Sequence, residues 1–181
     1  MTPMMRMPVL RQIYRTPEGP WWRRIAAFFL RPVVYEVAAP FFFESTSLDG
    51  TTFRLYLPKG FRSDLASTPR LTWLLGYRPD GFLLIPGLFH DFLYRHGFIV
   101  AVIPGEDGQE DKVVLLGASK YWADRLLMHL AHEIGGLHLP GRLAFIALTV
   151  CGWPAWWANA KYRAAALKTK KLQLQGDYTD D

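Results

Sequence analysis

An uncharged stretch of 18 residues, from Leu143 to Ala160, limits the folds available to this chain more than any other feature of its sequence. It lies between Arg142 and Lys161. As a helix rising about 1.5 Å per residue it would extend about 27 Å, the lower end of the length that crosses a membrane. The segment therefore has three placements open to it: packed in its own domain, lying on a membrane surface, or spanning the membrane.

Glycine and proline divide this stretch. Gly152-Trp153-Pro154 predicts a kink, because proline cannot donate the backbone hydrogen bond of a helix interior. Trp153, Trp156 and Trp157 gather at this end, as aromatic residues do at a membrane interface. We expect a buried helix that kinks here. Contact between the tryptophans and a membrane surface is the second interpretation, and a membrane span is the third.

The composition supports one folded domain. The chain has 181 residues, of which 50% are hydrophobic, and this excludes a disordered protein. The single cysteine, Cys151, has no disulfide partner and excludes a zinc site built from thiolates. The net charge of +5 is modest for a protein that must neutralise many phosphates, so we expect no nucleic-acid partner.

A basic, aromatic segment of residues 1–32 is expected to precede the domain. It carries six arginines against one acid, and its clearest cluster consists of Trp21, Trp22, Arg23 and Arg24. Such a cluster is typical of an anchor at a membrane interface, although a helix packed on its own domain fits as well. We place the single globular domain at residues 33–160 and a tail, first basic and then acidic, at residues 161–181.

The order of the patterns predicts an α+β fold. Residues 33–58 are rich in β-branched and aromatic residues, with a turn at residues 47–50 and period-two alternation over residues 52–57. These features predict a small antiparallel sheet that contains a β-hairpin. Helices are predicted over residues 86–95 and 119–133, each followed by glycine. The apolar helix described above would complete the fold.

Polar residues on the two predicted helices form the candidate site. His90 and Asp91 end an apolar run, and Tyr94 shares a helix face with His90. Asp124 lies at helical spacing from the largely apolar residues Tyr121, Leu127, Met128 and Ala131. A carboxylate there is costly unless a donor meets it. We therefore expect Asp124 to accept the proton of one His90 nitrogen and to support His90 as a general base.

A loop before the first helix adds oxygen ligands. Asp64 lies in the segment 63–70, which is rich in hydroxyl groups. Together with Asp91 and the loop carbonyls it offers hard oxygen ligands suited to calcium, which could polarise a substrate carbonyl. The alternative for the whole cluster is a buried hydrogen-bond network without turnover.

Two segments resemble a family of uncharacterised phage- and prophage-encoded proteins. That family has Gly-Phe-Thr-Asp-Leu-Ala-Ser-x-Pro-Arg and, later, His-Asp-x-Leu-Tyr. Here the first motif runs from Gly60 to Arg70, with Arg62 as an additional residue after Phe61 and Ser63 in place of threonine, and the second from His90 to Tyr94. The resemblance covers residues 33–160. It implies a phage protein in the host bacterial cytoplasm, at the inner-membrane surface or in the virion beside other virion proteins, and it implies no activity.

A second resemblance is to phospholipase A2, particularly the short prokaryotic and fungal type, over about 60 residues from Asp64 to Asp124. It implies a pair of antiparallel helices in which His90 is the base and Asp124 orients it. It also implies that Tyr94 braces Asp124 and that Ser67 gives structural support. The implied calcium ligands are Asp91, Asp64 and the carbonyl of Leu65. The chain departs from the secreted phospholipases because Cys151 has no partner and the loop lacks their dense glycines.

Three functions are open at this point. The first is a calcium-dependent, phospholipase A2-like lipid ester hydrolase at a membrane surface. The second is a structural protein of the phage virion or tail, in which the network around His90 is not catalytic. The third is a hydrolase of an amide link in envelope peptidoglycan. The segment from His129 to Glu133 lacks the His-Glu-x-x-His order of zinc proteases, so we expect its histidines to be structural or on the surface.

Overall fold

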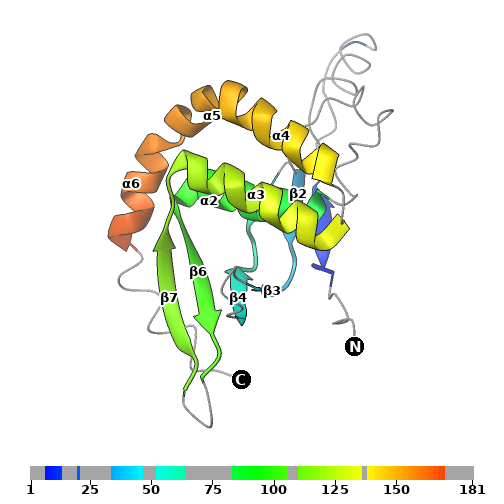
Figure 1. The fold of residues 1–181 in the computed structure, drawn as a ribbon. Helices are drawn as coiled ribbons and strands as arrows, with labels where there is room; N and C mark the ends of the chain where they lie inside the picture. Colours follow the sequence, from blue (N-terminus) through cyan, green and yellow to red (C-terminus); the bar gives the residue numbers. More distant parts are fainter. Residues whose placement is uncertain are drawn as a thin grey trace.

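The computed structural model describes residues 7–13, 20, 34–46, 52–63, 83–105, 110–135 and 138–169. For residues 138–141, 143–144 and 165–169 it describes the backbone alone. Over these ranges the fold contains two small antiparallel sheets and five helices (Figure 1). The predicted α+β class is therefore confirmed.

The first sheet joins a strand at the start of the predicted β-rich region with one strand from the segment before that region and one from just beyond its end. Its order is β1 (Leu10–Ile13), β2 (Val34–Val37) and β5 (Arg62–Ser63). In β2, Glu36 accepts hydrogen bonds from Arg11 at 2.7 Å and from Arg62 at 2.8 Å, and so bridges both neighbouring strands. Part of the basic N-terminal segment thus belongs to the sheet.

The second sheet has the order β3 (Phe41–Thr46), β4 (Thr52–Leu57), β6 (Phe98–Ile103) and β7 (Lys112–Gly117). Strands β3 and β4 form the predicted hairpin, although its turn lies outside the described residues. Alternate residues of β3 are buried, as the pleat of a strand with one covered face requires.

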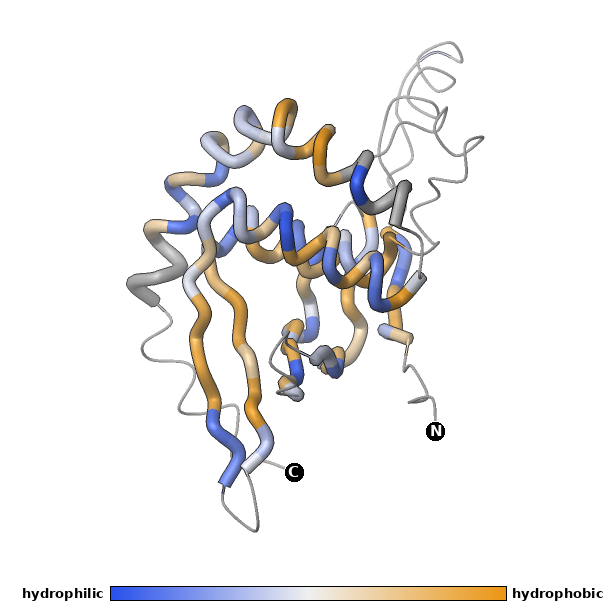
Figure 2. The backbone as a smooth tube through the Cα atoms, in the orientation of Figure 1, coloured by the Kyte–Doolittle hydropathy of each residue, from blue (hydrophilic) through white to orange (hydrophobic). Residues whose placement is uncertain are grey.

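The hairpin of β6 and β7 was not predicted. Both strands are hydrophobic along most of their length (Figure 2), and five consecutive residues of β6 are buried. A strand covered on both faces shows no period-two alternation, so the pattern that identified β4 could not identify β6.

Helix α2 (Leu84–His96) forms the centre of the core, and ten of its residues are buried. The Phe89 ring lies 6.2 Å from that of Phe41 and 6.3 Å from that of Phe43, so the helix packs on β3. The helix ends at Gly97, whose φ of 73° is the left-handed conformation that favours glycine. Helix α3 (Lys120–Gly135) packs against α2. Both helices agree with their predicted bounds to within two residues.

The C-terminal part is an arch of three helices over α2 and α3: α4 (His138–Cys151), α5 (Trp153–Ala158) and α6 (Ala160–Thr169) (Figure 1). The boundary between α4 and α5 falls at Gly152, where the kink was predicted, but Gly152 keeps helical backbone angles and helical hydrogen bonds run across it. The predicted burial is wrong for one side of the segment, where Val150 is 70% and Trp157 is 65% exposed. Helix α6 lies in the expected tail and packs on α2. No helix in the described part of the chain is long and apolar enough to cross a membrane.

Candidate functional site

Helices α2 and α3 bring His90 and Asp124 together, as the sequence predicted. Nε2 of His90 lies 3.0 Å from Oδ1 of Asp124. The two side chains are 4% and 0% exposed, so the bond is shielded from water. Asp124 shares the buried side of α3 with Ala123, Leu127 and Ala131, whereas Tyr121 is 58% exposed and does not belong to that side.

Tyr94 completes one side of the carboxylate. Its hydroxyl donates a 2.7 Å hydrogen bond to the same Oδ1 atom of Asp124. Its ring stacks on the imidazole of His90 with the ring centroids 4.1 Å apart, because the two residues lie one turn apart on α2. The position of the His90 ring is thus limited by a hydrogen bond on one side and a ring contact on another.

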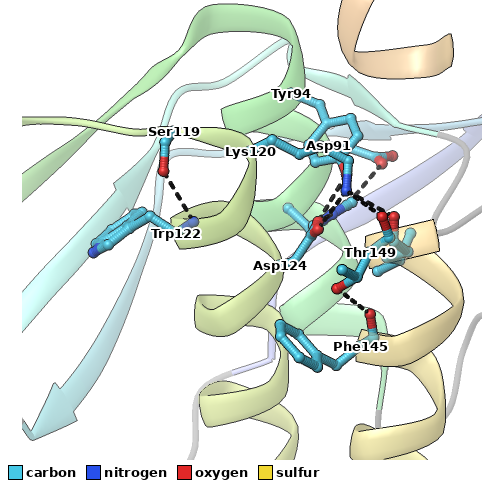
Figure 3. Close-up of polar contacts among 10 residues, drawn as sticks. Asp91, Tyr94, Ser119, Lys120, Trp122, Asp124, Phe145 and Thr149 are labelled. Atoms are coloured by element: carbon cyan, nitrogen blue, oxygen red, sulfur yellow. Dashed lines mark hydrogen bonds and ion pairs between the residues drawn. The ribbon is translucent and has the colours of Figure 1, made fainter. Parts of the chain in front are cut away.

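Lys120 is a member of the site that the sequence analysis missed. Its ammonium donates a 2.7 Å hydrogen bond to Oδ2 of Asp124, and its side chain is 4% exposed (Figure 3). The same ammonium donates to the carbonyl of Leu148 at 2.7 Å. The spacing of four residues between Lys120 and Asp124 is the signal that could have identified this pair.

The ends of two helices explain the position of Lys120. Helix α3 begins with Ser119, whose hydroxyl accepts the backbone N–H of Trp122 at 3.2 Å, and Lys120 is the first helical residue. A cation at a helix N-terminus opposes the helix dipole, but this ammonium reaches the last turn of α4, where carbonyls of Leu148 and Thr149 favour positive charge. Lys120 therefore ties the arch to the carboxylate of Asp124.

Gly152 allows this close approach. A Cβ atom at this position would lie 2.5 Å from the carbonyl oxygen of Leu148 and 2.6 Å from the hydroxyl of Tyr94. The glycine that predicted a kink therefore also has a packing role, since the break in the arch rests directly on the Tyr94–Asp124 pair.

The surroundings shift the proton affinities of the pair in opposite directions. Burial opposes ionisation of Asp124, but hydrogen bonds from His90, Lys120 and Tyr94 outweigh it and hold the pKa of the carboxyl below 3.8. Burial likewise disfavours charged His90, yet the carboxylates of Asp124 and Asp91 raise its pKa above 6.5. Burial and the Asp124 carboxylate strongly raise the pKa of the Tyr94 hydroxyl, so it remains a proton donor in the hydrogen bond.

The expected calcium ligands are only partly within the described residues. Asp91 accepts a hydrogen bond from Ser63, and one of its oxygens lies 4.0 Å from Nδ1 of His90. Asp64, Leu65 and Ser67 lie outside the described residues. Among the residues that the structure does describe, no group of three His, Cys, Asp or Glu side chains could hold a metal ion.

The predicted interface tryptophans divide into two kinds. Trp153 and Trp157 are exposed, with their ring centroids 5.5 Å apart. Trp156 instead packs edge-on against Tyr94 at 5.2 Å, and the guanidinium of Arg163 lies 3.8 Å above its ring centroid. Trp156 is therefore a packing residue. The four residues of the N-terminal cluster, 21–24, lie outside the described residues.

A second polar contact that sequence reasoning missed lies at the other end of α3. Ser45 of β3 is 1% exposed and donates a 2.8 Å hydrogen bond to Oε2 of Glu133. Nε2 of His129, a part-exposed residue, lies 3.8 Å from the same oxygen. This contact joins the second sheet to α3 and lies on α3 away from Asp124.

Comparison with known proteins places the chain in a family without assigning it an activity. No curated protein and no solved structure gives a significant match. A family model described as a protein of unknown function, DUF1353, matches residues 35–148. The match covers more than half of the chain and includes His90, Lys120 and Asp124 but not α5 or α6. The chain therefore belongs to the DUF1353 family of proteins of unknown function.

Proposed function

We propose that this protein is a hydrolase of lipid esters, similar in its chemistry to phospholipase A2, with His90 as general base and Asp124 as the residue that orients it. The observation that carries the proposal is the buried contact of 3.0 Å between His90 Nε2 and Asp124 Oδ1, with Tyr94 bound to the same oxygen. A carboxylate held in this way fixes both the tautomer and the orientation of the imidazole.

The contact supports one path for the proton. Asp124 is ionised, so Nε2 of His90 carries the hydrogen that it accepts. Nδ1, which faces an oxygen of Asp91 at 4.0 Å, is then the nitrogen that would take a proton from water. The resulting hydroxide would attack the ester carbonyl, and the bond between the acyl carbon and the alcohol oxygen would break. His90 would return its proton to the leaving alcohol, while Asp124 stabilises the imidazolium between the two steps.

The resemblance to phospholipase A2 favours a phospholipid as the ester and calcium as the cofactor. Of the expected ligands only Asp91 lies within the described residues, so no step is assigned to calcium here. The resemblance to phage- and prophage-encoded proteins suggests what the activity is for: a phage could use it in lysis of the host cell or in passage through the cell envelope.

The test is hydrolysis of a short-chain phosphatidylcholine by the full-length protein, with calcium and with a chelator. We expect His90→Ala and Asp124→Asn each to lower the rate by about 100-fold or more. Since the neighbouring carboxylates raise the pKa of His90, we expect the rate to rise with pH through a limb above the ordinary range of a histidine, as the base loses its proton. Loss of the calcium-dependent part of the rate in Asp91→Asn would support a calcium role.

His129→Ala is the matched control, because His129 is a part-exposed histidine that lies elsewhere on α3. It should leave the rate unchanged, and circular dichroism should show that every variant is folded. A wild-type protein that hydrolyses no phospholipid under either condition would refute the proposed activity. Turnover that persists in His90→Ala would refute the assigned base.

The second candidate is a structural protein of a virion or tail, and the burial of the cluster favours it. Asp124 is fully buried, and its carboxylate accepts a hydrogen bond from Lys120 in addition to its contacts with His90 and Tyr94. These contacts satisfy the carboxylate without any substrate. A protein that is stable, inert toward phospholipid and incorporated into particles would support this candidate over the first.

A further inference from the structure

The side of the arch that faces away from the core is apolar. Four large hydrophobic residues on α4 and α5 are exposed: Ile146 at 57%, Val150 at 70%, Trp153 at 44% and Trp157 at 65%. We call these four residues the outer stripe. Soluble proteins rarely expose such side chains in a contiguous group unless the group binds something.

The four residues lie on one side of a nearly continuous helix. Gly152 keeps helical backbone angles, with φ of −79° and ψ of −10°. Its N–H donates to the carbonyl of Leu148 at 2.7 Å, and its own carbonyl accepts from Trp156 at 3.0 Å. Successive members of the stripe are separated by four, three and four residues, which is the spacing of one helix face.

The charged residues that flank the stripe in sequence are all positive. The chain has no Asp or Glu between Glu133 and Asp177, a stretch that contains six Lys and Arg residues. Two of these, Arg142 and Lys161, are exposed and flank the stripe in sequence. A second copy of this chain would bring like charges together, whereas an anionic surface would meet opposite ones.

We propose that the outer stripe is the surface by which this protein binds anionic membranes, lying in the interface with the tryptophans at headgroup depth. An apolar helix face with exposed tryptophans between cationic residues is suited to that position. Trp153 also lies over the ammonium of Lys120, with Nζ 5.1 Å from the ring centroid, so the stripe adjoins the cluster of His90 and Asp124. This inference rests on the proposed function, because membrane binding by the stripe would bring the cluster of His90 and Asp124 to its lipid substrate.

Co-sedimentation of the full-length protein with vesicles tests the proposal without any assay of activity. One set of vesicles is pure phosphatidylcholine, and the other contains equal parts of phosphatidylcholine and phosphatidylglycerol. We expect binding to the second set, weaker binding as salt is raised, and a partition coefficient lowered about tenfold or more by Val150→Gln with Trp157→Gln. Arg142→Gln with Lys161→Gln should weaken binding to the anionic vesicles alone.

Leu115→Gln is the matched control, because Leu115 is 46% exposed on β7, outside the arch. It should bind as wild type, and thermal melting should show that all variants fold. Absence of binding to anionic vesicles, or binding unchanged in Val150→Gln with Trp157→Gln, would overturn the proposal. A dimer in the absence of lipid that the same double variant abolishes would assign the stripe to a second copy instead. His90→Ala should bind vesicles fully, so loss of the proposed activity and loss of binding are separate results.

Discussion

Replacement of Lys120 by methionine tests whether the cluster is held by charge. Methionine keeps most of the buried stem but removes the ammonium that donates to Oδ2 of Asp124 and to the carbonyl of Leu148, each at 2.7 Å. The Leu148 carbonyl still accepts the N–H of Gly152 at 2.7 Å. The atom that loses its donor is therefore Oδ2 of Asp124.

The magnitude follows from that remaining charge. Removing one partner of a buried ion pair costs about 3–5 kcal/mol, because the other charge stays desolvated. Asp124 keeps two donors on Oδ1, His90 and Tyr94, which places the expected loss at the lower end. We expect Lys120→Met to lower the free energy of unfolding by about 3 kcal/mol.

Urea unfolding at neutral pH, followed by circular dichroism, measures this loss in a double-mutant cycle with Asp124→Asn. In the Asp124→Asn background the buried ammonium of Lys120 has already lost its carboxylate, so Lys120→Met strands no further charge and should cost less than about 1 kcal/mol. Lys161→Met is the control for the same change on an exposed lysine, and it should cost less than about 0.5 kcal/mol. Equal losses in the two backgrounds would show that Lys120 acts through packing and would refute the argument from charge.

Three further predictions concern the surroundings of this pair. Gly152→Ala should destabilise the protein by about 2 kcal/mol in thermal melting, since its Cβ would meet atoms at 2.5 and 2.6 Å, whereas Gly117→Ala, with nothing within 4 Å, should not. Hydrogen bonds lower the pKa of Asp124 in the folded state. The stability they provide is therefore present at a pH above the pKa of the unfolded chain, and it is lost as the pH falls through the pKa of the folded protein. Asp124→Asn lacks this carboxylate, so its stability in urea titrations should fall less steeply across the acid range than that of the wild type. Ser45→Ala should cost about 1 kcal/mol in urea unfolding, because it removes the hydrogen bond that the buried Ser45 hydroxyl donates to Glu133, and an unchanged midpoint would contradict that role.

The parts of the fold that sequence predicted are those with a local cause. The hairpin of β3 and β4 follows from alternation, and the end of α2 follows from Gly97 in its left-handed conformation. The meeting of His90 with Asp124 could be predicted because a carboxylate among apolar residues requires a donor, and because the resemblance to phospholipase A2 pairs it with His90.

Other features had no local signal. Strand β6 is buried on both faces and so lacks alternation, and it was missed together with its partner β7. The boundary between α4 and α5 falls where Gly152 and Pro154 predicted a kink. The burial of this segment was predicted wrongly, because composition alone does not say how much of a helix another element covers.

Sequence by itself therefore determined the class of fold, the two helices that carry the site, and the pairing of His90 with Asp124. Only the tertiary structure decided that Lys120 joins them and that the arch turns Val150 and Trp157 outward. The physical reason is that helix periodicity and residue type are properties of residues close together in the chain. The contacts of the Lys120 ammonium, in contrast, depend on where the last turn of α4 lies. That placement results from the packing of α4 on α3 and of α6 on α2, which involves residues far apart in the chain.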